Sequence, residues 1–406
     1  MRRLGGAAIL MQASFNNLTF VVGDEKTLEK MQKLRPLVPF SEESIAFLNA
    51  LSKKLMAYGK EYSDVATFGF WCRRAALLKE KEKYDDLSTR LGRGIVFHST
   101  PSNVPVNFAF SFASGLLAGN ANIVRLPAKD FAQVQIICAC INELLTGEFA
   151  HLAPYICMVK YASDKQITDF FSSICHTRVI WGGDQTIENI RQSPLSPRAT
   201  EITFSDRHSI AVIHADEYLK MANKENIAID FYNDTFFTDQ NACTSPRIII
   251  WLGSKKEKAK KTFWQSIHEF VKNKYQIKPV QVVGKLNALF KVAAEHDVHL
   301  VRQEDQLITR VKLENLFENL MDYKYNSGFF FEYDANELAD ILPLCDVKCQ
   351  TLTYLGLSTT VIEEFFLNCR PLGVDRAVPV GKSMDFTLVW DGYDLIRELS
   401  RKFSVL

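Results

Sequence analysis

The first part of the chain carries apolar residues at helical spacing. Ile45, Leu48 and Leu55 recur at intervals that put them on one helix face, and Ser41 precedes them as a suitable N-cap. We therefore predict that residues 41–87 form helices that pack against the rest of the protein through their apolar faces.

From residue 94 onward, short apolar runs alternate with longer amphipathic segments. This alternation predicts βαβ units and a mostly parallel sheet. A polar region at 222–239 separates two groups of runs, so we predict two α/β lobes, the second starting between 210 and 240. The first group is GIVFH (94–98), NIVRL (122–126), YICMVK (155–160), RVIWG (178–182), EITF (201–204) and SIAVI (209–213), and the second is RIIIWL (247–252), VQVVG (280–284), DVHLV (297–301) and GFFFEY (328–333).

The composition is that of an ordinary globular protein, because 47% of the 406 residues are hydrophobic and 23% are charged. At roughly 150 residues per domain, this length predicts two or three domains. The 48 Lys and Arg against 47 Asp and Glu leave a net charge of +1, so we predict no general attraction to nucleic acid or anionic membranes. The longest mostly apolar stretch, 106–119, is shorter than the roughly 20 residues of a membrane span, and no span is predicted.

Nine cysteines, an odd number, are spread through apolar segments. This pattern favours reduced thiols in a cytoplasmic protein over a disulfide framework. The apolar run after Met1, up to Met11, lacks the length and the cleavage site of an export signal. No pair of His or Cys has a second pair at zinc-site spacing, so no metal site is predicted.

One cysteine stands in a different context. Cys243 lies among small and polar residues, in the stretch DQNACTSPR (239–247), directly before the apolar run 247–252. A thiol in a loop or at a strand edge can be reached by a substrate, and its thiolate is a strong nucleophile toward carbonyl carbon. From the residues alone, a structural cysteine is the competing interpretation.

A second candidate loop, PSNVP (101–105), follows the run 94–98. Loops beyond the carboxyl ends of strands bind ligands in open α/β sheets, although an exposed turn would look the same. The usual glycine fingerprint for dinucleotides is absent, because Phe97 stands where the third glycine after Gly92 and Gly94 is required.

These motifs, in this order, resemble the aldehyde dehydrogenase superfamily and, more closely, the LuxC-type acyl-CoA reductases. PSNVP matches the family's P-x-N-x-P, residues 118–127 match A-G-N before a strand that ends in a basic residue and proline, and 240–243 match Q-x-x-C. The similarity runs from about residue 35 to the C-terminus. Further matching segments are FWCRR (70–74), WGGDQTIENIR (181–191), FSDRHSIAVI (204–213), GVDRAVPVG (373–381) and DFTLVWDGYDL (385–395).

The resemblance implies an aldehyde-dehydrogenase-like α/β fold with two parallel-sheet lobes. The expected organisation is a helical N-terminal region at 1–90 that packs on the cofactor lobe, a nicotinamide cofactor lobe at 91–214, a catalytic lobe at 215–370, and a C-terminal segment at 371–406 that returns across the lobes. Superfamily relatives are commonly dimers or tetramers, so a homo-oligomer is expected.

The resemblance also implies the catalytic residues. Cys243 corresponds to the acyl-accepting nucleophile, and Asn103 to the asparagine whose amide joins the backbone N–H at the nucleophile in an oxyanion hole. A structural turn asparagine is the alternative for Asn103.

By position in the family, Ser99 and Thr100 line the cofactor cleft, Arg125 sits near the adenosine ribose, and the pyrophosphate end holds Gly182, Gly183 and Thr186. The fixed charge of Arg125 suits the 2′-phosphate of NADPH, with NADH as the alternative. A surface ion pair for Arg125 and a plain strand-to-helix turn for the two glycines are the competing interpretations.

One departure from the superfamily concerns water activation. Phe204 stands where hydrolytic aldehyde dehydrogenases carry a glutamate base, which favours acyl-CoA chemistry over hydrolysis, and Asp206 and His208 are expected to be structural. The implied activity is reduction of an acyl-CoA, in this family a fatty acyl-CoA, to the aldehyde, with an acyl-activating ligase as partner. The alternatives are a CoA-acylating aldehyde dehydrogenase acting oxidatively and a non-catalytic scaffold for an acyl-transfer partner.

Overall fold

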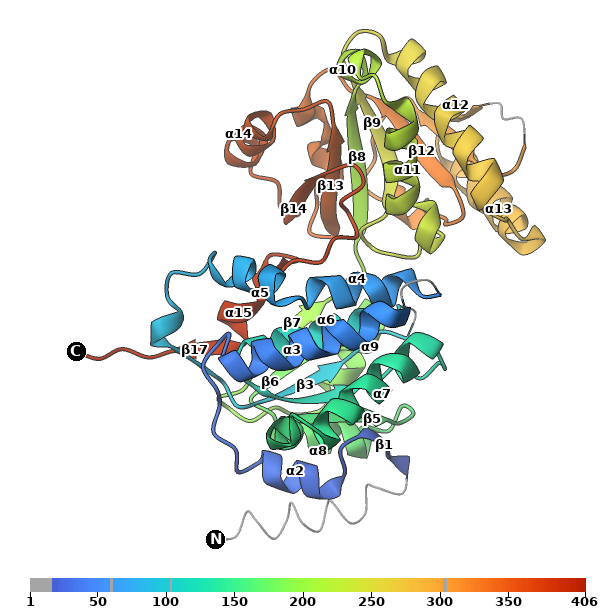
Figure 1. Ribbon diagram of the computed structural model, residues 1–406. Coiled ribbons are helices and arrows are strands. Elements are labelled where there is room, and N and C mark those ends of the chain that lie inside the picture. Colours follow the sequence, from blue (N-terminus) through green and yellow to red (C-terminus); the bar gives the residue numbers. More distant parts are fainter. Residues whose placement is uncertain (1–16, 59–60, 103, 302–304) are drawn as a thin grey trace. The chain divides into compact units, whose positions relative to one another are not determined.

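The computed structural model describes residues 17–58, 61–102, 104–301 and 305–406. The chain divides into two compact units, shown in Figure 1. The first unit ends at Ser205 and also contains Thr387–Leu406, whereas the second comprises Asp206–Phe386. Each is a sheet with helices on both faces, which confirms the predicted α/β class.

The sheet of the first unit has the strand order β1-β5-β4-β3-β6-β7. All neighbouring pairs are parallel except β1 with β5. A second, two-stranded sheet joins β2 to β17 near the C-terminus. The strands are β1 (Thr19–Val22), β2 (Arg90–Gly92), β3 (Ile95–Ser99), β4 (Ala121–Arg125), β5 (Ile156–Lys160), β6 (Thr177–Trp181), β7 (Thr200–Phe204), β15 (Val389–Trp390), β16 (Tyr393–Asp394) and β17 (Ser400–Lys402).

Alternate residues of these strands enter two different cores. Phe97 and Ile123 pack with Phe171 of α8 in the core that α2 and α8 cover, and α3, α6 and α7 lie over the other face (Figure 1). Parallel strands covered on both faces are apolar throughout, which is why their sequences read as continuous apolar runs. The helices are α2 (Glu25–Met31), α3 (Glu42–Leu55), α4 (Ser63–Trp71), α5 (Arg74–Lys81), α6 (Asn107–Leu117), α7 (Ala132–Thr146), α8 (Lys165–Ile174), α9 (Asp184–Arg191) and α15 (Leu395–Glu398).

The predicted helical lead-in is confirmed by α3, α4 and α5. The Ser41 hydroxyl caps α3 by accepting the Ser44 N–H at 3.3 Å. Phe47 of α3 meets Phe112 of α6 edge to face, with ring centroids 6.5 Å apart. The N-terminal region is therefore part of the first unit and not a separate domain.

The sheet of the second unit has the strand order β10-β11-β12-β9-β8-β13-β14, and only the edge pair β10 and β11 is antiparallel. Its strands are β8 (His208–His214), β9 (Pro246–Leu252), β10 (Val298–Val301), β11 (Thr309–Leu313), β12 (Phe329–Asp334), β13 (Cys349–Leu355) and β14 (Arg376–Pro379).

Two helical layers enclose this sheet. One core joins β8 and β9 to Phe231 of α11 and Phe263 of α12, and the other joins them to Leu289 of α13 and Phe365 of α14. The helices are α10 (Ala215–Lys220), α11 (Lys224–Asp234), α12 (Lys256–Lys274), α13 (Pro279–Glu295) and α14 (Thr359–Cys369).

The predicted strand at 280–284 is wrong, because these residues form the first turns of α13. Val280, Val282 and Val283 suggest a strand by their β-branched side chains. However, Pro279 occupies the first turn, where a proline favours a helix, and the buried residues Leu289 and Val292 continue a helical period beyond the run.

The boundary between the units also differs from the expected one at residue 214. The run 209–213 forms β8, which lies between β9 and β13 in the second sheet, so the division follows Ser205. Residues 371–386 belong to the second unit, and only the chain from Thr387 rejoins the first. The pattern of apolar residues records that β7 and β8 are buried strands, but it does not say which sheet each one joins.

Candidate active site

Cys243 lies in a loop that enters β9 from its N-terminal end. All nine cysteines are free thiols, of which seven are buried and two, Cys243 and Cys369, are partly exposed. The hydroxyl of Ser209, at the start of β8, donates a hydrogen bond to the Cys243 carbonyl at 2.7 Å. The backbone at the predicted nucleophile is therefore fixed to the neighbouring strand while its side chain is partly exposed.

The fully buried side chain of Gln240 holds the loop against the start of β12. Its amide donates to the carbonyls of Pro246 at 3.3 Å and Phe329 at 3.4 Å, and its oxygen accepts the N–H groups of Gly328 at 2.7 Å and Phe329 at 3.2 Å. The glutamine of the Q-x-x-C motif therefore has a positioning role, because all of its hydrogen-bonding capacity is used by backbone groups.

A buried cation is enclosed by the same loop. The Arg247 guanidinium donates to the carbonyls of Tyr325 at 3.0 Å and of Gln240, and to the Asn326 side chain at 2.5 Å. Burial lowers the pKa of Arg247 to about 10, whereas negative charge on Cys243 and on nearby carboxylates acts in the opposite direction. Arg247 is thus a buried positive charge fixed by hydrogen bonds to the loop that carries Cys243.

Asp239 ties the loop to the two helices that follow β9. Its carboxylate accepts the Tyr275 hydroxyl and the Gln281 side-chain N–H, the latter at 2.7 Å. Asp239 and Gln240 both adopt φ of 53°, a left-handed conformation that the surrounding hydrogen bonds maintain.

The segment after β14 lies on the other side of the loop. The Met384 sulfur accepts the Thr244 hydroxyl at 3.3 Å. Buried Asp234 holds this segment by accepting the N–H groups of Gly381 at 2.6 Å and Ser383 at 3.0 Å. Burial raises the pKa of Asp234 to about 6, and those two N–H groups act in the opposite direction.

In the first unit, three predicted cofactor residues gather where β3 and β4 end. Buried Ser99 ends β3, and the Thr100 hydroxyl donates to the Arg125 carbonyl at 2.6 Å. The Arg125 guanidinium donates to the Ala162 carbonyl at 3.2 Å and lies 4.4 Å from the centroid of the Tyr161 ring. Carbonyls and an aromatic face therefore hold Arg125, in place of the carboxylate that a surface ion pair would require.

The two predicted glycines follow β6 on the other side of β3. Gly183 is the N-cap residue of α9, which has no side-chain cap, and a Cβ added there would meet nothing within 4 Å. A Cβ on Gly182 would lie 3.0 Å from the Thr186 side chain. The open space before uncapped backbone N–H groups suits a phosphate, although the Asp184 carboxylate in the same turn opposes one.

The order of the strands explains why these residues lie at one edge. The chain passes from β3 to β4 on one side and later returns to β6 on the other, so the carboxyl ends of β3 and β6 flank a topological switch point. Open parallel sheets bind dinucleotides at such points. The residues present fit a nicotinamide dinucleotide, although the charge of Asp184 is unfavourable.

A buried polar network lies beside this edge of the sheet, and the sequence analysis did not predict it. His98 of β3 is bonded to Ser111 of α6 at 2.8 Å and to Asn122 of β4 at 3.0 Å, and Trp181 donates to the same Ser111 at 3.0 Å. Burial lowers the pKa of His98 to about 4, so the ring is neutral at pH 7. In the sequence, this network is indicated only by polar residues inside otherwise apolar strands.

The A-G-N motif is structural. Asn120 accepts the N–H groups of Arg93 at 2.7 Å and Gly94 at 3.1 Å and donates to the Leu399 carbonyl at 2.8 Å. Gly119 has φ of 89°, and a Cβ there would lie 2.3 Å from the Leu37 carbonyl oxygen. These residues join the amino end of β4 to the N- and C-terminal segments of the chain. The predicted cofactor residues lie at the carboxyl ends of the strands.

Position 204, where hydrolytic aldehyde dehydrogenases carry a glutamate base, holds a buried aromatic ring. Phe204 stacks on Trp181 with centroids 3.7 Å apart and meets Tyr393 edge to face at 5.6 Å. His208 is buried, and burial lowers its pKa to about 4. Asp206 forms an ion pair with Lys324 at 3.5 Å. The two polar residues thus have contacts that suit structural roles.

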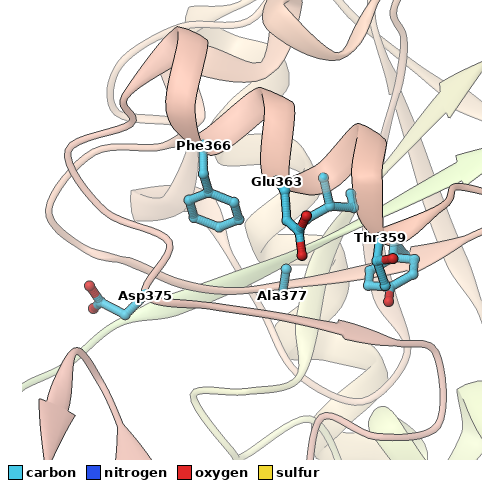
Figure 2. A pocket seen from close by; sticks show the side chains of 7 residues that line it. Thr359, Glu363, Phe366, Asp375 and Ala377 are labelled. Carbon is cyan, nitrogen blue, oxygen red and sulfur yellow. The ribbon is translucent and has the colours of Figure 1, made fainter.

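A groove of about 370 Å³ lies between α14 and the strands β13 and β14, and Figure 2 shows the side chains that line it. Its wall carries the carboxylates of Glu363 and Asp375 beside the ring of Phe366 and contains no basic residue. None of the predicted site residues lines it, and its charge does not suit the phosphates of CoA or a nicotinamide cofactor.

Asn103, the predicted oxyanion donor, lies outside the described residues. Among the residues that the structure covers, no helix is long and apolar enough to cross a membrane. Within the same ranges, no group of three or more His, Cys, Asp or Glu is placed to hold a metal ion.

Comparison with solved structures defines the class of the protein as an aldehyde-dehydrogenase-like fold. A benzaldehyde dehydrogenase from Corynebacterium glutamicum, described as NAD-dependent, has a TM-score of 0.62 at 14% identity, over 93% of this chain and 86% of that one. A 3,6-anhydro-L-galactose dehydrogenase, described as in complex with NAP, has a TM-score of 0.63 at 10% identity, over 96% of both chains. At these identities, the likeness concerns the fold alone.

The family is shown by sequence. Residues 72–402 match the model of the acyl-CoA reductase (LuxC) family, and the chain therefore belongs to that family. A curated relative, the long-chain acyl-protein thioester reductase of Vibrio harveyi, is 26% identical over 169 residues. This match covers 41% of the chain and about a third of the relative, 34% of its length.

Proposed function

We propose that the chain reduces a fatty acyl thioester to the aldehyde with NADPH, through a covalent thioester on Cys243. The observation that carries this proposal is the loop of Cys243, which has a partly exposed cysteine and a carbonyl, that of Gln240, bonded to the buried guanidinium of Arg247, in a chain of the acyl-CoA reductase family. A buried structural cysteine would need neither the exposure nor the cation.

In the first step, the Cys243 thiolate attacks the thioester carbonyl, a C–S bond to Cys243 forms, and the bond to CoA breaks. CoA leaves as a thiol with the proton that Cys243 gave up. Arg247 favours the thiolate, and Ser209 and Gln240 hold its backbone in place. The role that the family implies for Asn103 is donation of a side-chain N–H to the oxyanion, together with the Cys243 N–H.

NADPH, when bound, would supply the hydride that converts the acyl group to the oxidation level of an aldehyde. Thr100, Arg125 and the turn at Gly182–Gly183 are the residues that would hold it, and the charge of Arg125 would favour a 2′-phosphate. The tetrahedral adduct on Cys243 then releases the aldehyde and regenerates the thiol. Because Phe204 replaces a carboxylate base, the chain has no glutamate there to activate water against the thioester.

Two apolar side chains, one in contact with the residue after Cys243 and one six positions before it in the chain, support an acyl chain as part of the substrate. Met384 contacts Thr244, and Phe237 is 54% exposed six residues before Cys243. The name of the Vibrio harveyi relative, a long-chain acyl-protein thioester reductase, supports a long acyl group and a donor that is either CoA or a protein. An acyl-activating ligase would then be the partner that loads Cys243.

The test is NADPH and NADH consumption by the purified chain with a panel of short to long acyl-CoAs and with trapping of the aldehyde. Cys243→Ala should abolish turnover, whereas Cys369→Ala, at the other partly exposed cysteine, should leave it unchanged. Asn103→Ala should slow turnover by about 10²–10³-fold, as loss of one oxyanion donor does.

The alternatives give different results. Oxidation of aldehydes that requires added CoA, with no reduction of any acyl-CoA, would favour a CoA-acylating dehydrogenase. Failure to bind NADPH, together with slow and uniform alkylation of all nine cysteines, would favour the scaffold.

A further inference from the structure

Two charged side chains of the second unit hold the backbone of residues 381–385, the segment after β14. Asp234, the last residue of α11, is fully buried, and its two carboxylate oxygens accept the N–H groups of Gly381 at 2.6 Å and Ser383 at 3.0 Å. Arg376, the first residue of β14, donates to carbonyls of the same segment. These are the carbonyls of Lys382 at 2.9 Å, Ser383 at 2.8 Å and Asp385 at 2.6 Å. The position of the segment therefore depends on two side chains.

The segment 381–385 also lies directly on the last turns of α11. Gly381 has φ of 91°, a left-handed conformation that favours glycine. A Cβ added to Gly381 would lie 2.6 Å from the Cβ atom of Asp230, which is too close for any other residue without displacement of the segment. Hydrogen bonds and close packing thus place the segment at one position on the helix.

One apolar side chain of the segment reaches the loop of the predicted nucleophile. The Met384 sulfur accepts the Thr244 hydroxyl at 3.3 Å, and Thr244 directly follows Cys243. Met384 is 36% exposed, so part of its side chain can still contact a substrate. The backbone of the Cys243 loop is held separately, by Ser209 and by Gln240. A displacement of the segment would therefore move Met384 and leave the nucleophile in place.

We propose that Asp234 is a positioning residue of the Cys243 site, which holds the segment 381–385 so that Met384 flanks the acyl chain of the substrate, and that protonation of Asp234 releases this contact. The inference rests on the proposed function, because it takes an acyl thioester as the substrate. Asp234 acts through Met384 and not on the reacting atoms. The binding of long acyl chains, rather than the reaction at Cys243, should therefore depend on the ionisation of Asp234.

The hold on the segment requires an ionised carboxyl group. A carboxylate accepts at both oxygens, whereas the neutral group carries a proton on one oxygen and makes weaker hydrogen bonds. Burial raises the pKa of Asp234 to about 6, the N–H groups of Gly381 and Ser383 act in the opposite direction, and the negative charge of Asp230 adds to the increase. Asp234 is therefore mostly ionised above pH 6 and mostly protonated below it, so acidification through this pH should release the segment.

Charged groups lie on each element around Asp234. They are Asp230 on α11, Arg376 on β14, Lys382 and Asp385 on the segment itself, and Lys260 on α12. Lys382 pairs with Asp385 at 3.2 Å, and Lys260 pairs with Asp334 at 2.7 Å. Asp230, by contrast, is an exposed residue whose charge can be removed while the hydrogen bonds of the segment stay in place.

The first experiment measures kcat and KM for short and long acyl-CoAs from about pH 5 to about pH 8. For the wild-type chain, KM for a long acyl-CoA should rise about fivefold as Asp234 is protonated, the factor that roughly one hydrogen bond to a charged group contributes. Asp234→Asn keeps the size of the side chain without its charge and should have the raised KM at every pH. Between the two chains, kcat and the KM for a short acyl-CoA should be alike.

Asp230→Asn is the matched control, since it makes the same change one turn earlier on α11. It should leave KM for a long acyl-CoA unchanged near pH 8, where Asp234 is ionised in both chains. Because the negative charge of Asp230 raises the pKa of Asp234, its removal should shift the rise in KM to lower pH. A purely structural role of Asp234 predicts no such shift, so coincident pH profiles of wild type and Asp230→Asn would count against the proposal.

A double variant tests whether Asp234 acts through Met384. Met384→Ala should raise KM for a long acyl-CoA and leave that for a short one unchanged, because the shorter chain does not reach the lost side chain. Adding Asp234→Asn to Met384→Ala should then have no further effect on KM. Independent effects that multiply would show that Asp234 influences the substrate by another route.

Hydrogen exchange of the backbone amides separates this proposal from the proposed function, since it needs no turnover. At pH 7.5, Asp234→Asn should lose protection at Gly381 and Ser383, the amides that the carboxylate accepts, and keep it in residues 246–252 of β9. Unchanged protection at the two amides, or a wild-type KM for long acyl-CoAs that does not respond to pH, would overturn the positioning role. A wild-type chain with protected amides that reduces no acyl thioester would overturn the proposed function instead.

Discussion

The two units share a three-layered plan but place their candidate chemistry at opposite ends of their parallel strands. In the first unit, Ser99, Arg125 and Gly183 follow the carboxyl ends of β3, β4 and β6. In the second, Cys243 precedes the amino end of β9. The first arrangement relies on backbone groups and open space, which suit binding, whereas the second relies on buried side chains that fix a loop.

The difference shows what each task requires. A cofactor must enter and leave, so its predicted residues surround a turn where even an added Cβ at Gly183 meets nothing. A nucleophile must stay in place while the substrate reacts, and the loop of the predicted nucleophile is held by four hydrogen bonds of the Gln240 side chain, two donated and two accepted, and by three that Arg247 donates. Preorganised side chains of this kind are what reactive residues need.

The largest effect is expected from Gln240→Leu. The substitution removes four hydrogen bonds and leaves buried backbone groups unsatisfied, so the second unit should lose about 3–5 kcal/mol of stability. Urea unfolding followed by tryptophan fluorescence measures this loss. Gln185→Leu, at an exposed glutamine of α9, should change stability by less than about 0.5 kcal/mol. A small loss of stability in Gln240→Leu would refute the positioning role of Gln240 in the loop of Cys243.

Acid should destabilise both units through their buried histidines. The pKa values of His98 and His208 are lowered to about 4 by burial, whereas in the unfolded chain they lie near 6.5. The neutral rings are thus compatible with folding above pH 6.5, and stability is lost as the pH falls from 6.5 to 4, by at most about 3 kcal/mol for each ring.

Denaturant titrations at pH 7 and pH 4.5 measure this loss. His208→Gln should reduce the difference between the two pH values in the second unit while leaving that of the first unit unchanged. An unaltered pH dependence in the variant would show that other groups dominate acid unfolding.

A smaller effect is expected when the positive charge of Arg247 is removed. Arg247→Met should slow alkylation of Cys243 by iodoacetamide at pH 7 by about tenfold or more, since roughly 1.4 kcal/mol of electrostatic stabilisation of the thiolate corresponds to that factor. Arg247→Lys should restore much of the rate. Arg207→Lys, at an arginine that pairs with Asp375, is the control and should react like the wild type. Equal rates in all three variants would contradict electrostatic activation by Arg247.

The smallest effect concerns the cofactor. Arg125→Ser should weaken NADPH binding by about tenfold and leave NADH binding nearly unchanged, because only the 2′-phosphate needs the guanidinium. Titration of cofactor fluorescence measures both affinities. An equal loss for the two cofactors would mean that Arg125 mainly supports the edge of the sheet through Ala162 and Thr100.

Much of the architecture could be predicted from local patterns. The alternation of apolar runs predicted two layered units, and the spacing after Ser41 predicted the helices α3 to α5. Where the pattern was ambiguous, it failed: the valines at 280–283 read as a strand although they begin α13. Phe97 replaces the third glycine of a standard fingerprint, and the fold nevertheless has a switch point suited to a dinucleotide.

The sequence by itself determined which segments are buried, which cysteine stands in a polar loop, and which family the motifs resemble. Only the tertiary structure decided that β8 joins the second sheet, that Gln240 and Asn120 bond distant backbone groups, and that the Arg247 guanidinium donates to the Gln240 carbonyl in the loop of Cys243. The physical reason is that hydrophobic patterning records burial along the chain, whereas a hydrogen bond such as Ser209 to Cys243 depends on which distant segments the fold brings together.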